Sequence, residues 1–255
     1  MADLHIEVSG AGSDLVLLHG WGMHGGVWAG VVPVLAQAHR VYVVDLPGYG
    51  DSAAITPYTL DTMVQPLADS LPPQFDLCGW SLGGQVALML AARYPTRVRR
   101  LATVGCNPCF VTRADWSHGV PSEVLQLFAD SLAQDYTGTL KRFLALQVQG
   151  DATARAVLTQ LRALLFARGQ PTDAVLKDGL AILLHADLRP LLGEIKQSTL
   201  VVHGEHDTLA PLAAGAWLAD ALPNARFHAV PGASHAPFLS HSADFTAALS
   251  DFLHG

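Results

Sequence analysis

Short apolar runs alternate along the chain with longer amphipathic stretches, and this alternation restricts the fold more than any other feature. The apolar, β-branched runs predict strands at 14–20, 40–48, 75–80, 100–105, 199–205 and 226–232. Amphipathic periodicity predicts helices at 60–71, 81–94, 211–222 and 243–253. Strands that alternate with helices form βαβ units around a parallel sheet. We therefore predict an α/β fold, with a mostly parallel central sheet flanked by helices and 5–8 as an antiparallel edge strand.

The alternation stops between 112 and 186, where only helical periodicity remains. Ser122, Asp151 and Thr172 are plausible helix starts, and Gly150 and 169–171 interrupt the pattern. We predict about four helices here. They would form a cap over 112–186, inserted in a core that comprises 1–111 and 187–255.

Composition excludes several classes of function. The net charge is −7, so we expect neither nucleic-acid binding nor attraction to anionic membranes. Residues 15–39 contain no Asp, Glu, Lys or Arg, but five glycines and Pro33 argue against a membrane span. The first ten residues do not resemble a signal peptide, so we expect a cytoplasmic protein.

Two of the three cysteines, Cys106 and Cys109, form a C-x-x-C pair. Structural zinc takes four ligands, and the chain has no second pair of this kind. We therefore expect no metal and interpret both cysteines as small packing residues.

The sequence GWSLGG at 79–84 follows a predicted strand and opens a predicted helix. In this context the G-x-S-x-G pattern is typical of a nucleophile elbow, whose glycines let the strand and helix approach closely. A tight turn without catalytic function is the alternative. The context favours Ser81 as a nucleophile.

A serine nucleophile needs a base and an acid, which follow it in the order Ser, Asp, His. Asp207 and His235 come directly after two consecutive predicted strands. They therefore lie at the carboxyl ends of the strands, the same end of the sheet as Ser81. We predict His235 as the base and Asp207 as the residue that orients it. Asp45 and Asp51 also follow a strand and are rivals for the acid.

Acyl transfer also needs donors for the oxyanion. We predict that the amides of Leu82 and Trp21 supply them, because both lie next to predicted strand ends. The indoles of Trp21 and Trp80 would line the site, or they pack in the core. His19 is interpreted as a structural hydrogen-bonding residue.

Basic residues also occur in the predicted cap. Arg155 and Arg162 are seven residues apart, on one face of a helix beside Leu158, Leu161 and Leu165. A cationic edge over an apolar slot suits a substrate with an apolar chain and an anionic carrier. A solvated helix face is the alternative, and the sequence leaves both open.

Several motifs resemble the α/β-hydrolase superfamily: VLLHGWG, VDLPGYGDS, GWSLGG, LVVHGEHD and GASHAPF. HGWGM, GWSLGGQVA, RFLALQ and SHAPFLSHSADF are similar to the family of carboxylesterases that act on the methyl ester of pimeloyl-acyl carrier protein in biotin synthesis. The resemblance implies a serine esterase with an α/β-hydrolase fold, no cofactor, and the triad Ser81, Asp207 and His235. Its transient partner would be acyl carrier protein, and small esters would also be substrates.

The resemblance further implies residue roles outside the triad. The substrate would contact Trp21, Ser81, Leu82, His235 and the stretch Phe143, Leu144, Ala145, Leu146 and Gln147. The carrier protein would dock on Lys141, Arg142, Arg155 and Arg162. The chain departs from the family at Gly138 and Thr159, where further arginines are expected.

Three alternatives remain at this point. A broad-specificity short-chain esterase and a C–C bond hydrolase would use the same triad, and a ligand-binding receptor could retain it without turnover. Dehalogenases and epoxide hydrolases of this superfamily need a carboxylate where Ser81 stands, so the sequence disfavours both.

Overall fold

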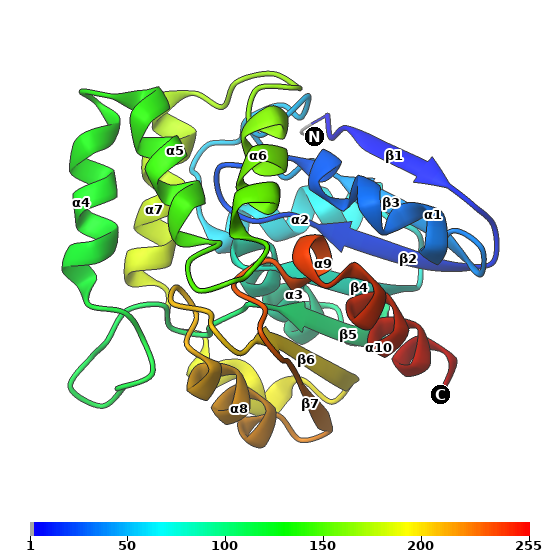
Figure 1. Ribbon diagram of the computed structural model, residues 1–255. Coiled ribbons are helices and arrows are strands. Elements are labelled where there is room, and N and C mark those ends of the chain that lie inside the picture. Colours follow the sequence, from blue (N-terminus) through cyan, green and yellow to red (C-terminus); the bar gives the residue numbers. More distant parts are fainter. Residues whose placement is uncertain (1–2) are drawn as a thin grey trace.

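The computed structural model describes residues 3–255 and contains one seven-stranded sheet with the strand order β1-β3-β2-β4-β5-β6-β7 (Figure 1). Strand β1 pairs antiparallel with β3, and every other neighbouring pair is parallel. The predicted α/β architecture and its antiparallel edge strand are therefore confirmed. The strands are β1 (Ile6–Ser9), β2 (Ser13–Leu18), β3 (His39–Val44), β4 (Phe75–Trp80), β5 (Val98–Val104), β6 (Ser198–Gly204) and β7 (Ala225–Val230).

The central strands are apolar because helices cover the sheet on both faces. All six residues of β4 are buried, as are the last four residues of β2 and of β5. The register places Leu18 beside Val44 of β3 and Gly79 of β4. The loops after these three strands consequently start at one level, where polar side chains can meet.

Helices α1 and α10 lie in front of the sheet in Figure 1, and α2 and α3 lie behind it. Helix α3 packs on β4 and β5, and α8 packs on β6 and β7. The predicted core helices are confirmed, whereas α1, α9 and the two 3-10 helices were not predicted, because they are too short to show a period. The core helices are α1 (Val32–Leu35), α2 (Leu60–Ser70), α3 (Leu82–Arg93), α8 (Leu212–Ala221), α9 (Pro237–Ser240) and α10 (Ser242–His254), with 3-10 helices η1 (Gly25–Gly30) and η2 (Arg189–Glu194).

Four helices lie between β5 and η2 in the chain: α4 (Ser122–Leu132), α5 (Tyr136–Leu146), α6 (Ala154–Leu164) and α7 (Asp173–His185). Figure 1 shows α4, α5 and α7 beyond the ends of the parallel strands, with α6 nearer the sheet. They lie beyond the carboxyl ends of the parallel strands (Figure 1), and Ser81 directly follows one of these strands, β4. That 112–186 forms a separate domain stays a prediction.

The starts of these helices match the sequence in two of three places. Helix α4 begins at Ser122, and the Thr172 side chain caps α7 by accepting from the Val175 amide. The prediction for Asp151 is wrong, because Thr153 is the N-cap of α6. The Asp151 carboxylate instead accepts from the amide and hydroxyl of Thr153, which places the turn before the helix.

Cys78, Cys106 and Cys109 are free thiols, and all three are buried. Burial raises the pKa of the Cys78 thiol to about 12, and it raises the pKa of Cys106 still further. Cys78 and Cys106 therefore behave as small apolar side chains, whereas Cys109 Sγ accepts from Arg113 Nε at 3.1 Å. Among residues 3–255, no helix has the length and hydropathy that crossing a membrane requires.

Candidate active site

Ser81 lies at a sharp turn between β4, which ends at Trp80, and α3, which starts at Leu82. Its φ is 56° and its ψ is −117°, and among residues 3–255 it is the one non-glycine residue with a positive φ. A Cβ on Gly79 would lie 2.2 Å from the Gly83 carbonyl oxygen, and one on Gly83 would lie 2.4 Å from that of His19. Glycine is thus required on both sides of a strained serine, as in a nucleophile elbow.

The loops after β6 and β7 bring two further predicted residues to Ser81. His235 Nε2 lies 3.0 Å from Ser81 Oγ, and His235 Nδ1 lies 2.7 Å from Asp207 Oδ2. Ser81, Asp207 and His235 are exposed by 4%, 5% and 1%. The three side chains therefore form one buried hydrogen-bonded series.

Backbone contacts hold this series in place. Asp207 Oδ1 accepts from the amides of Leu209 at 2.9 Å and Ala210 at 2.8 Å, which leaves Oδ2 to face His235. The Trp80 indole donates to the His235 carbonyl at 2.9 Å. A serine hydroxyl beside an oriented imidazole can pass its proton to that base and attack an ester carbonyl.

Two backbone amides beside Ser81 suit an oxyanion. Within residues 3–255, the amides of Leu82 and Trp21 have no intramolecular acceptor. The loop that carries Trp21 lies against the nucleophile, because a Cβ on Gly20 would lie 3.1 Å from Ser81 Cβ. Two free donors on the two sides of a nucleophile suit a tetrahedral intermediate. Their catalytic role stays a prediction.

His19 stabilises the loop that carries Trp21. Burial lowers the pKa of His19 to about 4, although the nearby Asp45 carboxylate opposes the shift. The neutral ring donates from Nδ1 to the Gly20 carbonyl at 2.8 Å and accepts at Nε2 from the Leu46 amide at 2.9 Å. These bonds agree with the structural role that the sequence suggested.

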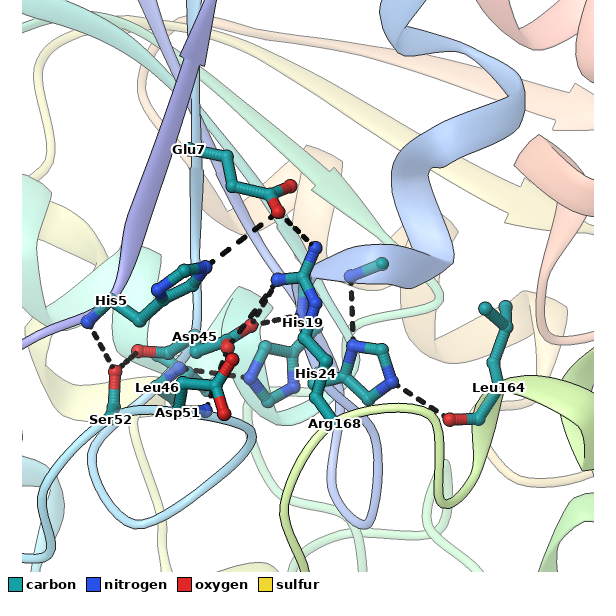
Figure 2. Close-up of polar contacts among 12 residues, drawn as sticks. His5, Glu7, His19, His24, Asp45, Leu46, Asp51, Ser52, Leu164 and Arg168 are labelled. Carbon is teal, nitrogen blue, oxygen red and sulfur yellow. Dashed lines mark hydrogen bonds and ion pairs between the residues drawn. The ribbon is translucent and has the colours of Figure 1, made fainter.

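Asp45, a rival for the triad acid, belongs to a different polar cluster (Figure 2). Its carboxylate accepts from the amides of Gly25 at 2.6 Å and Asp51 at 3.1 Å, and Arg168 Nη1 lies 3.4 Å from Oδ1. Arg168 also pairs with Glu7. Burial would raise the pKa of Asp45, but the protonated form of His19, the two amides and Arg168 outweigh burial and lower it. This cluster fastens the loop between α6 and α7 to β1 and to the loop after β3.

The same cluster contains one group that could be considered for a metal. His5, Asp45 and Asp51 place their ligand atoms within 4.8 Å of one another. The Arg168 guanidinium already neutralises Asp45, so a cation would have to displace it. The arrangement therefore favours an ion pair over a metal centre.

The stretch predicted to contact substrate spans the end of α5. Phe143, Leu144 and Gln147 are buried, Leu146 is half-buried and Ala145 is exposed. The Phe143 ring centroid lies 4.6 Å from that of Trp21 and 5.3 Å from that of Phe128. Gln147 Oε1 is buried and has no partner within residues 3–255. These contacts form an apolar wall with one free acceptor, and the substrate-binding role of the stretch stays a prediction.

The four basic residues predicted to dock a carrier are all exposed on α5 and α6. Arg142 Nη1 lies 3.1 Å from Asp135 Oδ2. The Gly138 amide donates to Asp135, and a Cβ on Gly138 would lie 2.0 Å from that carboxylate. The departure at Gly138 therefore has a local reason, because this glycine fits the capped first turn of α5. Nothing in the structure explains Thr159.

The sequence interpretation missed Ser234 and His206, which precede His235 and Asp207 and contact the cap through hydrogen bonds. Their positions beside the predicted triad residues were the only available signal, because the partners are backbone carbonyls far away in the chain.

Comparison with known proteins places the chain among related sequences and folds. The α/β hydrolase fold family matches residues 15–242. The pimeloyl-acyl-carrier protein methyl ester esterase of Nitrosomonas europaea is 48% identical over 247 residues, which are 97% of this chain and 98% of that protein. The protein of the same name from Nitrosospira multiformis is 43% identical over 256 residues, 98% of this chain and 97% of that protein.

Solved structures agree on the fold. An enol-lactonase from Burkholderia xenovorans LB400 superposes with a TM-score of 0.87 at 27% identity, covering 100% of this chain and 97% of that one. An esterase from Exiguobacterium antarcticum gives a TM-score of 0.92 at 23% identity, covering 100% of this chain and 96% of that one.

Proposed function

The chain belongs to the α/β-hydrolase family, within the group of pimeloyl-acyl-carrier protein methyl ester esterases, and we propose that it hydrolyses this methyl ester through Ser81. The observation that carries the proposal is the buried series from Asp207 through His235 to Ser81, with the serine at a strained elbow. The near full-length identity to esterases of that name supports the substrate.

In the first half of the reaction, His235 Nε2 takes the proton of Ser81 as Oγ attacks the methyl ester carbonyl. The amides of Trp21 and Leu82 donate hydrogen bonds to the negative charge that develops on the carbonyl oxygen. The tetrahedral intermediate then breaks its bond to the methoxy oxygen, and His235 returns the proton to release methanol. The acyl chain remains esterified to Ser81.

In the second half, His235 deprotonates a water molecule that attacks the acyl-enzyme carbonyl. Collapse of the second tetrahedral intermediate breaks the bond to Ser81 Oγ, which recovers its proton from His235. The product is a free carboxylic acid at the far end of the chain, still attached to its carrier. No step uses a metal or an organic cofactor.

The acyl chain of the substrate reaches the buried serine from the cap side. Ser81 is exposed by only 4%, so the substrate must enter as an extended chain while the carrier remains outside. Lys141, Arg142, Arg155 and Arg162 give the exposed faces of α5 and α6 a positive charge in a chain of net charge −7. The exposed pair between Arg142 and Asp135 contributes little, so an acidic carrier can replace Asp135 at small cost.

Complementation of a biotin-requiring strain that lacks its carrier-ester esterase tests this function. The wild-type gene should restore growth without biotin, and a gene encoding Ser81→Ala should not. Failure of the wild-type protein to restore growth, despite its expression as a folded protein, would argue against the proposed substrate. Hydrolysis of a dienone substrate without ester hydrolysis would instead point to C–C bond cleavage.

A further inference from the structure

The connection between α5 and α6 lies across both loops that carry the acid and the base. We call residues 147–151 the cap strap. The His235 amide donates to the Gln147 carbonyl at 3.1 Å, and Ser234 Oγ donates to the Gln149 carbonyl at 3.1 Å. His206 Nδ1 donates to the Gly150 carbonyl at 2.9 Å. Three successive bonds thus join the cap to the residues beside and within the triad.

The cap strap has its own supports, so it can act as a fixed reference. Gly150 has a φ of 88°, and a Cβ there would lie 3.1 Å from His206 Cβ. Asp151, exposed by 7%, accepts from the Thr153 amide at 2.7 Å at the start of α6. His241 Nδ1, between α9 and α10, lies 3.8 Å from Asp151 Oδ2 and attracts this carboxylate when the imidazole is protonated.

The two side-chain bonds differ in how readily water can replace them. Ser234 is exposed by only 2% and its bond to the Gln149 carbonyl is partly buried, so water replaces the lost hydroxyl less easily here than at the ring of His206. The side chain of His206 is exposed by 47%, and water can occupy the position of its ring. The loss of the Ser234 hydroxyl should therefore disturb its neighbour His235 more than the loss of His206 disturbs Asp207.

We propose that Ser234 and His206 are positioning residues that use the cap strap to hold His235 and Asp207 in register with Ser81. The triad is then completed by the cap as well as by the core, and this inference rests on the proposed roles of those three residues. Because the bonds act on the base and acid, their loss affects every ester in the same way, whatever its size.

The test is the rate at which a fluorophosphonate labels Ser81, measured together with kcat and KM on p-nitrophenyl butyrate and with Tm. Ser234→Ala should lower both the labelling rate and kcat about tenfold and leave KM nearly unchanged, because small shifts of a catalytic base are costly. Ser234→Thr, which keeps the hydroxyl, should recover most of the loss. His206→Ala should lose about threefold, and His206→Asn should recover it by donating from a position close to Nδ1.

Two control variants separate positioning from stability. Thr199→Val removes a buried hydroxyl that donates to the Gln197 carbonyl at the start of β6, whereas Asp207 follows the end of this strand. His228→Ala removes a half-buried histidine that pairs with Asp244 on α10. Neither should change the labelling rate.

Wild-type labelling rates in both Ser234→Ala and His206→Ala would overturn the inference and leave the proposed function standing. An equal loss of labelling in Thr199→Val would overturn it too, because the effect would then be one of stability. If Ser234→Ala fails to fold, the more exposed His206 pair decides alone. Wild-type protein that is not labelled at Ser81 would refute the proposed function itself.

Discussion

Replacement of Asp207 by asparagine should remove most activity and leave the fold intact, because the two carboxylate oxygens have different hydrogen-bond partners. Oδ1 accepts from the amides of Leu209 and Ala210, and Oδ2 faces His235 Nδ1 at 2.7 Å. Asparagine must keep its oxygen toward the two amides, since they have no other acceptor. Its NH₂ group is then forced to face His235 Nδ1.

A donor at that position reverses the tautomer of the imidazole. His235 Nδ1 becomes the acceptor and Nε2 carries the proton, so the nitrogen 3.0 Å from Ser81 Oγ can no longer take the serine proton. The same reversal in a serine protease lowers kcat about 10⁴-fold, which corresponds to about 5 kcal/mol of transition-state stabilisation. We expect a loss of this order in Asp207→Asn.

The assay is kcat on p-nitrophenyl butyrate, with Tm as the measure of folding. Asp207→Asn should keep its Tm within a few degrees, because both backbone hydrogen bonds survive. Asp45→Asn is the matched variant: it weakens the pair with Arg168 and should lower Tm while kcat changes little. Retention of most activity by Asp207→Asn, together with its loss in Asp45→Asn, would refute the assignment of the acid.

Three further predictions follow from the same structure. Ser81→Ala should abolish fluorophosphonate labelling and lower kcat by several orders of magnitude; labelling at another residue would contradict this. Arg142→Glu combined with Arg155→Glu should lower kcat/KM on the carrier-linked methyl ester about tenfold, which corresponds to about 1.4 kcal/mol. The rate on p-nitrophenyl butyrate should be nearly unchanged. Equal losses on both substrates would mean that the arginines stabilise the cap. Burial lowers the pKa of His203 from 6.5 to about 4. Between these two pH values the unfolded chain binds a proton that the folded chain does not, so the free energy of unfolding decreases as the pH falls. Both ring nitrogens of His203 lack a partner within residues 3–255, so His203→Leu should flatten the fall in Tm between pH 6.5 and 4, and an unchanged slope would contradict this.

The strands, the cap helices and the elbow were predictable from local patterns. The central strands β2, β4, β5 and β6 each contain a buried, mostly apolar run, and GWSLGG combines glycine spacing with a strand-to-helix change. The positions of Asp207 and His235 near Ser81 could be predicted, because in a parallel sheet the loops after the strands all lie at the carboxyl ends of the strands.

The contacts between cap and core could not be predicted, because they join residues that no periodicity relates. Arg168 meets Asp45 across 123 positions of sequence, and Ser234 meets the carbonyl of Gln149 across 85. A backbone carbonyl carries no signal in the sequence, so the cap strap is visible only in three dimensions. The short helix α1 was missed because four residues cannot show a helical period.

The most direct test of the proposed function is the intact mass of a methyl-pimeloyl carrier protein incubated with the purified enzyme. Hydrolysis at the methyl ester should lower the mass of the carrier by one methylene group and release methanol, with the thioester to the carrier intact. Ser81→Ala should leave the mass unchanged over the same time. An unchanged mass with the wild-type enzyme, or a loss of the whole acyl chain, would contradict the proposed function.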